Sequence, residues 1–201
     1  MSTDIPIRDA ATVILLRDMP DGPRVLMGQR GRGAVFMPGK FVFPGGAVDL
    51  SDHDRDPPGH LSPVCARRLA LEADPALVRA LPNAALRELR EETGLVLPDA
   101  SGLRFVFRAI TPPGRSRRFD ARFFVVDAAG LDGDPDDFGA AEDELSHLQW
   151  VTLADARSFD LPFVTRVVLG EVEAALGRTA PPAHVPFYDN RAALGQIRAL
   201  R

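Results

Sequence analysis

The nine residues Arg87–Leu95, reading RELREETGL, constrain this 201-residue chain more than any other segment. On an α-helix, Glu88, Glu91 and Glu92 fall at positions i, i+3 and i+4, so their carboxylates share one face. Each like-charge pair at this spacing costs an isolated helix about 0.2–0.5 kcal/mol. A divalent cation reverses that effect, because carboxylate oxygens are good ligands for Mg²⁺ and Mn²⁺. The segment predicts a metal site, and a solvated face with Arg87 paired to Glu91 is the alternative.

The flanking residues give this helix predicted limits. Pro82 and Asn83 are signals for its start, and Gly94 is a signal for its end. Upstream of it, residues 43–46 read FPGG and predict a tight turn after an apolar run. A glycine turn and a carboxylate-rich helix are therefore the two elements to be placed together.

A glycine loop followed by a helix reading Arg-Glu-aliphatic-X-Glu-Glu-X-Gly-aliphatic resembles the Nudix box of the Nudix hydrolases. The helix half matches at every defined position, namely Arg87, Glu88, Leu89, Glu91, Glu92, Gly94 and Leu95. The loop half departs from the pattern, because Gly46 precedes Arg87 by 41 positions where the family has 14, an insertion of 27 residues. The resemblance implies an α/β (α+β) fold, a Nudix-type α/β/α sandwich with a mixed sheet and a helical insertion inside the box.

The insertion, about residues 50–80, leaves two questions open. The family's additional glutamate between loop and helix has no counterpart, since residue 79 is an arginine. Asp49, Asp52 and Glu72 are the candidate replacements. The apolar content of the insertion favours a packed element over disorder. It is interpreted either as a wall of the substrate pocket or as a helical hairpin packed on the domain, and its use in a homodimer stays open.

Length and composition fit one domain, 1–201, with box halves at 43–49 and 82–96 and a C-terminal helix and tail at 160–201. Hydrophobic residues make up 45% of the chain, enough for a substantial core. The net charge of −4 gives no general attraction to nucleic acid. The N-terminus lacks a signal peptide, and the aliphatic run Val13–Leu16 is too short to span a bilayer. We therefore expect a cytoplasmic protein without a membrane partner.

Alternating strand and helix patterns run along the chain. The predicted strands are Ala11–Arg17, Arg24–Arg30, Leu103–Ile110, Ala121–Asp127 and Leu148–Val151. The predicted helices lie near Pro63–Ala73, Leu153–Ser158 and Phe163–Leu176, with a further short helical segment before Pro82.

The resemblance implies metal-dependent hydrolysis of a phosphoanhydride in a nucleoside diphosphate derivative, with Mg²⁺ or Mn²⁺ as the cofactor. It makes Glu91 and Glu92 direct metal ligands, and Glu88 a ligand or the residue that positions the attacking water. Arg87 would hold a neighbouring carboxylate through a charge-assisted hydrogen bond. The carbonyl of Gly45 or Gly46 would add a further oxygen ligand.

The general base of the family often lies in a later loop. Glu142, Asp143 and Glu144 form an acidic cluster shortly before Trp150. We choose Glu144 as the candidate base. A solvated acidic loop, continuing the aspartates at 132–137, is the alternative for these residues.

Residues upstream of the box resemble the signature of the Nudix coenzyme A diphosphatases, in a subgroup whose box is split by an insertion. Arg30, Gly39 and the FPGG element coincide with it, whereas Val35 replaces an expected arginine. Coenzyme A carries a diphosphate and a 3′-phosphate, so its site needs cations besides the metal. The candidate substrate-binding residues are Arg30, Lys40, Gly46, Arg115, Arg117 and Arg118. Surface solubility is the alternative for the arginines and the lysine.

The leading hypothesis is hydrolysis of coenzyme A or an acyl-coenzyme A by a Nudix pyrophosphohydrolase, whose partner is a small nucleotide-type substrate. One alternative is a hydrolase of ADP-ribose, NADH or another nucleoside diphosphate linked to a second group. A second alternative is a Nudix-fold sensor that binds a nucleotide without cleaving it. Loss of box carboxylates would signal the sensor, and all three are present.

Overall fold

The computed structural model describes residues 5–178, 180–192 and 194–201. Within these ranges the strands are β1 (Ile7–Arg17), β2 (Arg24–Arg30), β3 (Phe41–Val42), β4 (Gly45–Ala47), β5 (Arg104–Ile110), β6 (Arg118–Asp127), β7 (Leu145–Thr152), β8 (Val185–Asp189) and β9 (Gln196–Leu200). The α-helices of the same ranges are α1 (Pro63–Leu69), α2 (Leu77–Thr93), α3 (Leu153–Ala156) and α4 (Phe163–Ala175).

The strands form one mixed sheet in the order β3-β2-β1-β6-β5-β8-β9, with β4 added to β1 and β7 added to β2. The central pair, β1 and β6, is parallel over ten residue pairs, from Ile7↔Arg118 to Leu16↔Asp127. The β5–β8 pair is also parallel, whereas the other neighbours are antiparallel. The mixed sheet predicted from the family resemblance is therefore confirmed.

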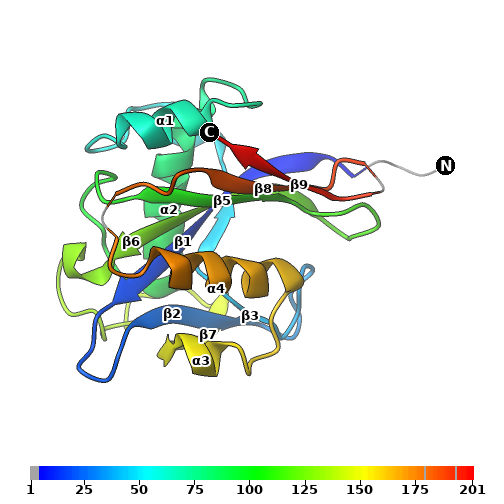
Figure 1. The fold of residues 1–201 in the computed structure, drawn as a ribbon. Coiled ribbons are helices and arrows are strands. Elements are labelled where there is room, and N and C mark those ends of the chain that lie inside the picture. The colour runs from blue at the N-terminus through cyan, green and yellow to red at the C-terminus, as the bar shows by residue number, and fades with distance from the viewer. Residues whose placement is uncertain (1–4, 179, 193) are drawn as a thin grey trace.

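Two apolar cores lie on opposite faces of this sheet. The first packs α1 and α2 against β1, β5 and β6, and includes Leu69, Leu81 and Leu89. The second packs α3 and α4 against the other face, and includes Val168 and Leu169. Figure 1 shows α1 and α2 on one side and α4 on the other. This arrangement is the three-layer sandwich predicted from the sequence.

Most of the predicted elements are confirmed, with small shifts at their ends. The predicted start of the carboxylate helix is wrong. Helix α2 begins at Leu77, five residues before Pro82, and Pro82 lies inside it. Proline lacks the N–H that would bond to the carbonyl four residues earlier, which weakens a helix. Burial of Leu77 and Leu81 in the first core offsets that loss. The predicted end is confirmed, because Gly94 has φ 77° and its N–H bonds to the Arg90 carbonyl.

The C-terminal strands β8 and β9 were not predicted from the sequence. They form an antiparallel hairpin whose first strand extends the sheet beside β5. The segment contains Pro186 and ends in polar residues, so neither period-two alternation nor a two-residue turn motif marks it. Pairing with β5 decides the structure of this segment, and the local sequence does not predict a pairing between strands so far apart in the chain.

The insertion packs as part of the domain. Cys65, Leu69 and Leu77 lie in the first core, and the guanidinium of Arg68 donates to the carbonyls of Pro182 and Ala183. None of residues 50–80 is among those that line the large pocket described below. Of the two interpretations of the insertion, its position supports the packed helical hairpin and not the pocket wall.

In the part of the chain that the structure describes, no helix combines the length and the apolar character that crossing a bilayer requires.

Candidate functional site

The two halves of the box meet where β4 crosses the carboxylate face of α2. The backbone N–H of Gly45 donates to Oε2 of Glu92 over 2.6 Å. The next residue, Gly46, lies against Glu88, because a Cβ atom at position 46 would stand 2.3 Å from Oε1 of that glutamate. Gly45 also has φ 154° and sits close to the backbone of Ala11 and Thr12. Both glycines are required here for close approach, as loop glycines are where a backbone contacts a functional group.

Burial changes the acidity of two box carboxylates. Desolvation raises the pKa of Glu92 to about 8, against the opposing hydrogen bond from Gly45. Desolvation also raises the pKa of Glu88, although the neighbouring Arg87 charge lowers it. The charge of Glu144 raises both values further, so Glu144 lies near the pair. Perturbed carboxylates of this kind gather at functional sites.

Arg87 organises the other side of the carboxylate face. Its guanidinium donates to both carboxylate oxygens of Asp52, over 3.2 and 2.9 Å, and to the carbonyl of Ala47. One nitrogen, Nη1, also donates to Oε1 of Glu88 and Oε2 of Glu91, each over 2.9 Å. Burial lowers the pKa of Arg87, but these acceptors outweigh it and raise the pKa above its ordinary value.

Asp52 is the carboxylate of the insertion that meets the box. Its side chain is 4% exposed and pairs with Arg87 in a bidentate arrangement. Of the other two candidates, Asp49 is more exposed and 3.8 Å from Arg87, and Glu72 pairs with Arg191 and Arg198 elsewhere. Of the three acidic residues predicted as replacements for the family's additional glutamate, Asp52 is the one with a buried side chain paired to Arg87.

The residues of this face suit a hard cation. Oε1 of Glu92 is buried and has no hydrogen-bond partner among the described residues. Such an orphaned carboxylate oxygen is costly to bury and matches the oxygen ligands of Mg²⁺ and Mn²⁺. Within the described residues, no three His, Cys, Asp or Glu side chains already converge as a ready-made ligand set. Arg87 donates to one oxygen of Glu88 and to one oxygen of Glu91, so the second oxygen of each carboxylate makes no bond to Arg87.

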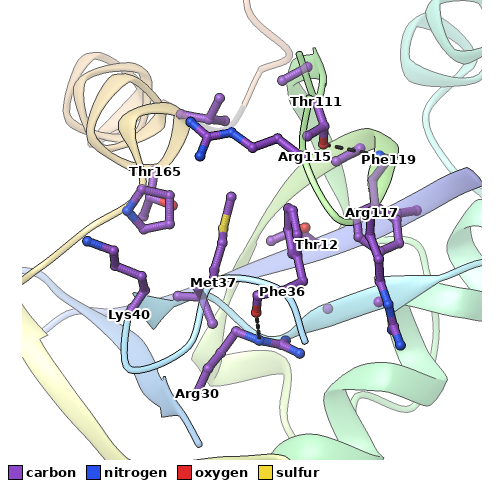
Figure 2. Close-up of a pocket in the computed structure, with 18 of the residues that line it drawn as sticks. Thr12, Arg30, Phe36, Met37, Lys40, Thr111, Arg115, Arg117, Phe119 and Thr165 are labelled. Carbon is purple, nitrogen blue, oxygen red and sulfur yellow. Dashed lines mark hydrogen bonds between the residues drawn. The ribbon is translucent and has the colours of Figure 1, made fainter. Parts of the chain in front are cut away.

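A pocket of about 1090 Å³ opens beside the box. Its walls come from β1, the 30–40 loop, β4, the β5–β6 hairpin and the start of α4, and its lining includes Gly45, Gly46 and Glu88. Figure 2 shows the cationic side chains of Arg30, Lys40, Arg115 and Arg117 around this space. The lining is therefore acidic at the box and basic around it, as a metal-bound diphosphate would need.

Predicted site residues upstream and downstream of the box converge on the pocket. Nη2 of Arg30 donates to Oε1 of Glu144 over 2.9 Å, and both residues line the pocket. Lys40 also lines it, with Nζ 2.5 Å from Oδ1 of Asp160. Glu144 precedes β7, which pairs with β2, and this pairing brings it beside Arg30.

The three arginines of the β5–β6 hairpin differ in position. Arg115 and Arg117 are exposed and line the pocket, as expected for substrate contacts. Arg118 is 5% exposed and donates to the carbonyls of Thr111 and Asn190. It is absent from the residues that line the pocket. Alternation along β6 turns it inward, so its position favours support of the hairpin over the predicted contact with substrate.

Several pocket residues were missed from the sequence. Phe163 and Thr165, at the start of α4, and Tyr188, in β8, line the pocket. The rings of Phe163 and Tyr188 lie 5.9 Å apart in an edge-to-face arrangement. Their sequence neighbourhood reads as ordinary helix and strand, and only the packing of α4 and β8 beside β5 brings them to the site.

Comparison with known families and structures agrees with this geometry. Residues 79–169 match the NUDIX domain model, and this segment begins two residues after the start of α2 and contains Glu88, Glu91 and Glu92. A NUDIX hydrolase from Alicyclobacillus acidocaldarius is 28% identical, with a TM-score of 0.63 over 83% of this chain and 90% of that chain.

Two more distant structures share the fold. An Ap4A hydrolase from C. elegans is 17% identical, with a TM-score of 0.56 over 85% of this chain and 98% of that chain. The NUDIX domain of Shewanella oneidensis NrtR, complexed with ADP ribose, is 16% identical, with a TM-score of 0.54 over 85% of this chain and 89% of that chain.

Proposed function

Since this chain belongs to the Nudix domain family and carries a Nudix hydrolase domain, we propose that it hydrolyses the phosphoanhydride of coenzyme A or an acyl-coenzyme A. The family resemblance drawn from the box is confirmed. The coenzyme A subgroup, the metal and the site residues are proposals that rest on the pocket.

One observation carries the proposal: the partly buried carboxylate of Glu88 and the buried carboxylate of Glu92 lie against the two glycines of β4, at the wall of a large, cation-lined pocket. A diphosphate repels an attacking nucleophile, because its own oxygens are negative. A site that cleaves it needs positive charge at the phosphates and an acceptor for the proton of the attacking water. The pocket offers both, with cations on its walls and carboxylates at the box.

We propose that Glu88, Glu91 and Glu92, with the carbonyl of Gly45, hold Mg²⁺ or Mn²⁺. When bound, the metal neutralises the diphosphate and lowers the pKa of a coordinated water. Arg87, fixed by Asp52, keeps the carboxylates in place. Glu144 is the proposed proton acceptor, because it lies at the pocket near Glu88 and Glu92.

The size and charge of the pocket support a substrate larger than a mononucleotide. Its volume, about 1090 Å³, lies slightly above the usual range for small-molecule sites, roughly 300–1,000 Å³. Arg117 and Arg30 are available for the diphosphate beside the box, and Arg115 and Lys40 line another part of the same space. Apolar residues such as Val35 and Phe163 are exposed to 63% and 66% and would suit an uncharged arm.

The test offers purified protein with Mg²⁺ or Mn²⁺ a parallel set of substrates: coenzyme A, acetyl-coenzyme A, ADP-ribose, NADH and nucleoside triphosphates. We expect coenzyme A or its thioester to have the highest kcat/KM, with 4′-phosphopantetheine-type and 3′,5′-ADP-type products. Turnover of ADP-ribose or NADH far above coenzyme A would reject the substrate while leaving phosphoanhydride hydrolysis intact.

The ADP-ribose alternative has its own support, because the NrtR domain of the same fold is complexed with that ligand. A non-catalytic sensor is the third outcome of the same assay. Tight nucleotide binding without cleavage of any compound, measured with the metal present, would favour the sensor.

A further inference from the structure

The cations that line the pocket fall into two groups. Figure 2 shows the side chain of Arg117 extending toward α2, on the same side as Arg30. Arg115 extends the opposite way, toward the start of α4, and Lys40 lies on that side as well. Of these four side chains, Arg117 and Arg30 lie on the side of the box, so Arg115 and Lys40 are placed for a different anion.

The start of α4 offers hydrogen-bond donors at that second position. Its N-cap is Pro162, which provides no side-chain cap, and the first helical bond runs from the Arg166 N–H to the Pro162 carbonyl. The N–H groups of the first turn therefore have no partner within the helix. With the helix dipole, such a turn attracts negative charge.

Thr165 provides the independent indication of a ligand. It lines the pocket and is 6% exposed, yet its hydroxyl makes no hydrogen bond to any part of the chain that the structure describes. Polar groups of largely buried residues are normally paired with protein or with ordered water, so this hydroxyl has room for a partner from the pocket. Arg115 likewise has no ion pair among the described residues, whereas Lys40 is paired with Asp160. Among the described residues, Thr165 thus brings an unpaired hydroxyl and Arg115 an unpaired guanidinium to the side of the pocket where α4 begins.

We propose that the start of α4, with Thr165 and Arg115, forms a second anion site that binds a phosphate monoester remote from the scissile diphosphate. The positive charge of Lys40 adds less to this site, because its ammonium group is paired with the carboxylate of Asp160. The inference rests on the proposed function, in which the 3′-phosphate of coenzyme A is such a group. The second site would distinguish substrates by whether they carry a phosphate monoester on the ribose. A nucleoside diphosphate derivative with this group would bind at both sites, and one without it would bind only at the box.

Two matched substrate pairs test the site. Coenzyme A is compared with 3′-dephospho-coenzyme A, and NADPH with NADH, which lacks the 2′-phosphate. Loss of charge-assisted hydrogen bonds predicts about a tenfold or greater reduction in kcat/KM for the substrate without the monoester. The 3′ and 2′ pairs separately identify which ribose phosphate reaches the site.

Variants locate the effect. In Arg115→Ala and Thr165→Val proteins, the preference between the paired substrates should shrink toward one. Arg166→Ala is the matched control, since Arg166 is an exposed arginine of the same helix that does not line the pocket. Binding of adenosine 3′,5′-bisphosphate and of AMP, measured by calorimetry without metal, gives a readout that is independent of catalysis.

The outcomes separate this inference from the proposed function. Equal kcat/KM for coenzyme A and its dephospho form, with equal binding of the two adenosine phosphates, would overturn the second site and leave the activity standing. Preference for NADPH over NADH without coenzyme A cleavage would support the site and reject the substrate. A preference for monoester substrates that Arg115→Ala and Thr165→Val leave intact would also contradict the proposal.

Discussion

Gly46 and Glu88 are in direct contact across the two halves of the box, since a Cβ at position 46 would lie 2.3 Å from a carboxylate oxygen of Glu88. The contact joins β4 to α2, although Gly46 precedes Arg87, the first residue of the helix half of the box, by 41 positions. Tertiary structure thus reunites what the insertion divides.

Gly46→Ala tests this contact. The added methyl meets the flexible end of a glutamate, so the side chain can move and the melting temperature should fall little. The displaced carboxylate should nevertheless reduce kcat/KM by about 100-fold, as misplaced catalytic groups do. Gly31→Ala is the control, because that glycine has open space around it. Full activity of Gly46→Ala would show that the position of Glu88 is unimportant.

Asp52→Asn removes the charge that fixes Arg87. Because Asp52 is 4% exposed, the loss should reduce the free energy of unfolding by about 1–3 kcal/mol, measured by urea unfolding. Activity should fall as well, since Arg87 also holds Glu88 and Glu91. Asp49→Asn, at a 55% exposed and more distant carboxylate, should change neither value appreciably.

Glu92→Gln separates metal binding from folding. Desolvation of Glu92 opposes its charge, so the uncharged amide should not lower the melting temperature in the presence of EDTA. The rise in melting temperature that Mg²⁺ or Mn²⁺ produces in the unaltered protein should be lost, and kcat/KM should fall by about 100-fold or more. An undiminished metal-induced shift together with full activity would reject Glu92 as a ligand.

Glu144→Gln tests the proposed proton acceptor. Removing a general base costs about 10²–10⁴-fold in rate, so kcat should fall by that order with little change in KM. The acidic limb of the rate profile against pH should also change, which a purely structural loss would not produce. Glu142→Gln, at an exposed neighbour, is the control. Equal losses in both variants would point to the acidic loop as a whole.

Stability in acid depends on a second charged cluster, which consists of Glu72, Asp189, Arg191 and Arg198. Hydrogen bonds from Arg191 hold the pKa of Asp189 well below its usual range, and Arg198 lowers the pKa of Glu72. Both carboxyls bind protons more weakly in the folded state, so their stabilising effect is present near neutral pH. It is lost as pH falls below about 4. Arg198→Gln should therefore lower the melting temperature at pH 7 and reduce its further fall between about pH 5 and pH 2. An unchanged melting profile over this range would contradict the assignment.

The carboxylate helix and its glycine stop were predictable because they depend on short spacings. Glu88, Glu91 and Glu92 share a face by helical periodicity, and Gly94 adopts a backbone conformation that other residues disfavour. The central strands were likewise predictable from their apolar patterns. Pro82 misled the prediction, because burial of Leu81 and its neighbours outweighs a local rule.

The amino-acid sequence by itself predicted the Nudix domain, the shared carboxylate face of the helix and most of the elements, because these follow from residue type and local period. Only the tertiary structure decided that Asp52 pairs with Arg87, that Arg118 turns inward and that Thr165 joins Arg115 at the pocket. Such choices depend on strand pairing and burial between residues far apart in the chain. The spacing of residues along the chain does not predict these contacts, because the packing energy of a side chain depends on its neighbours in space.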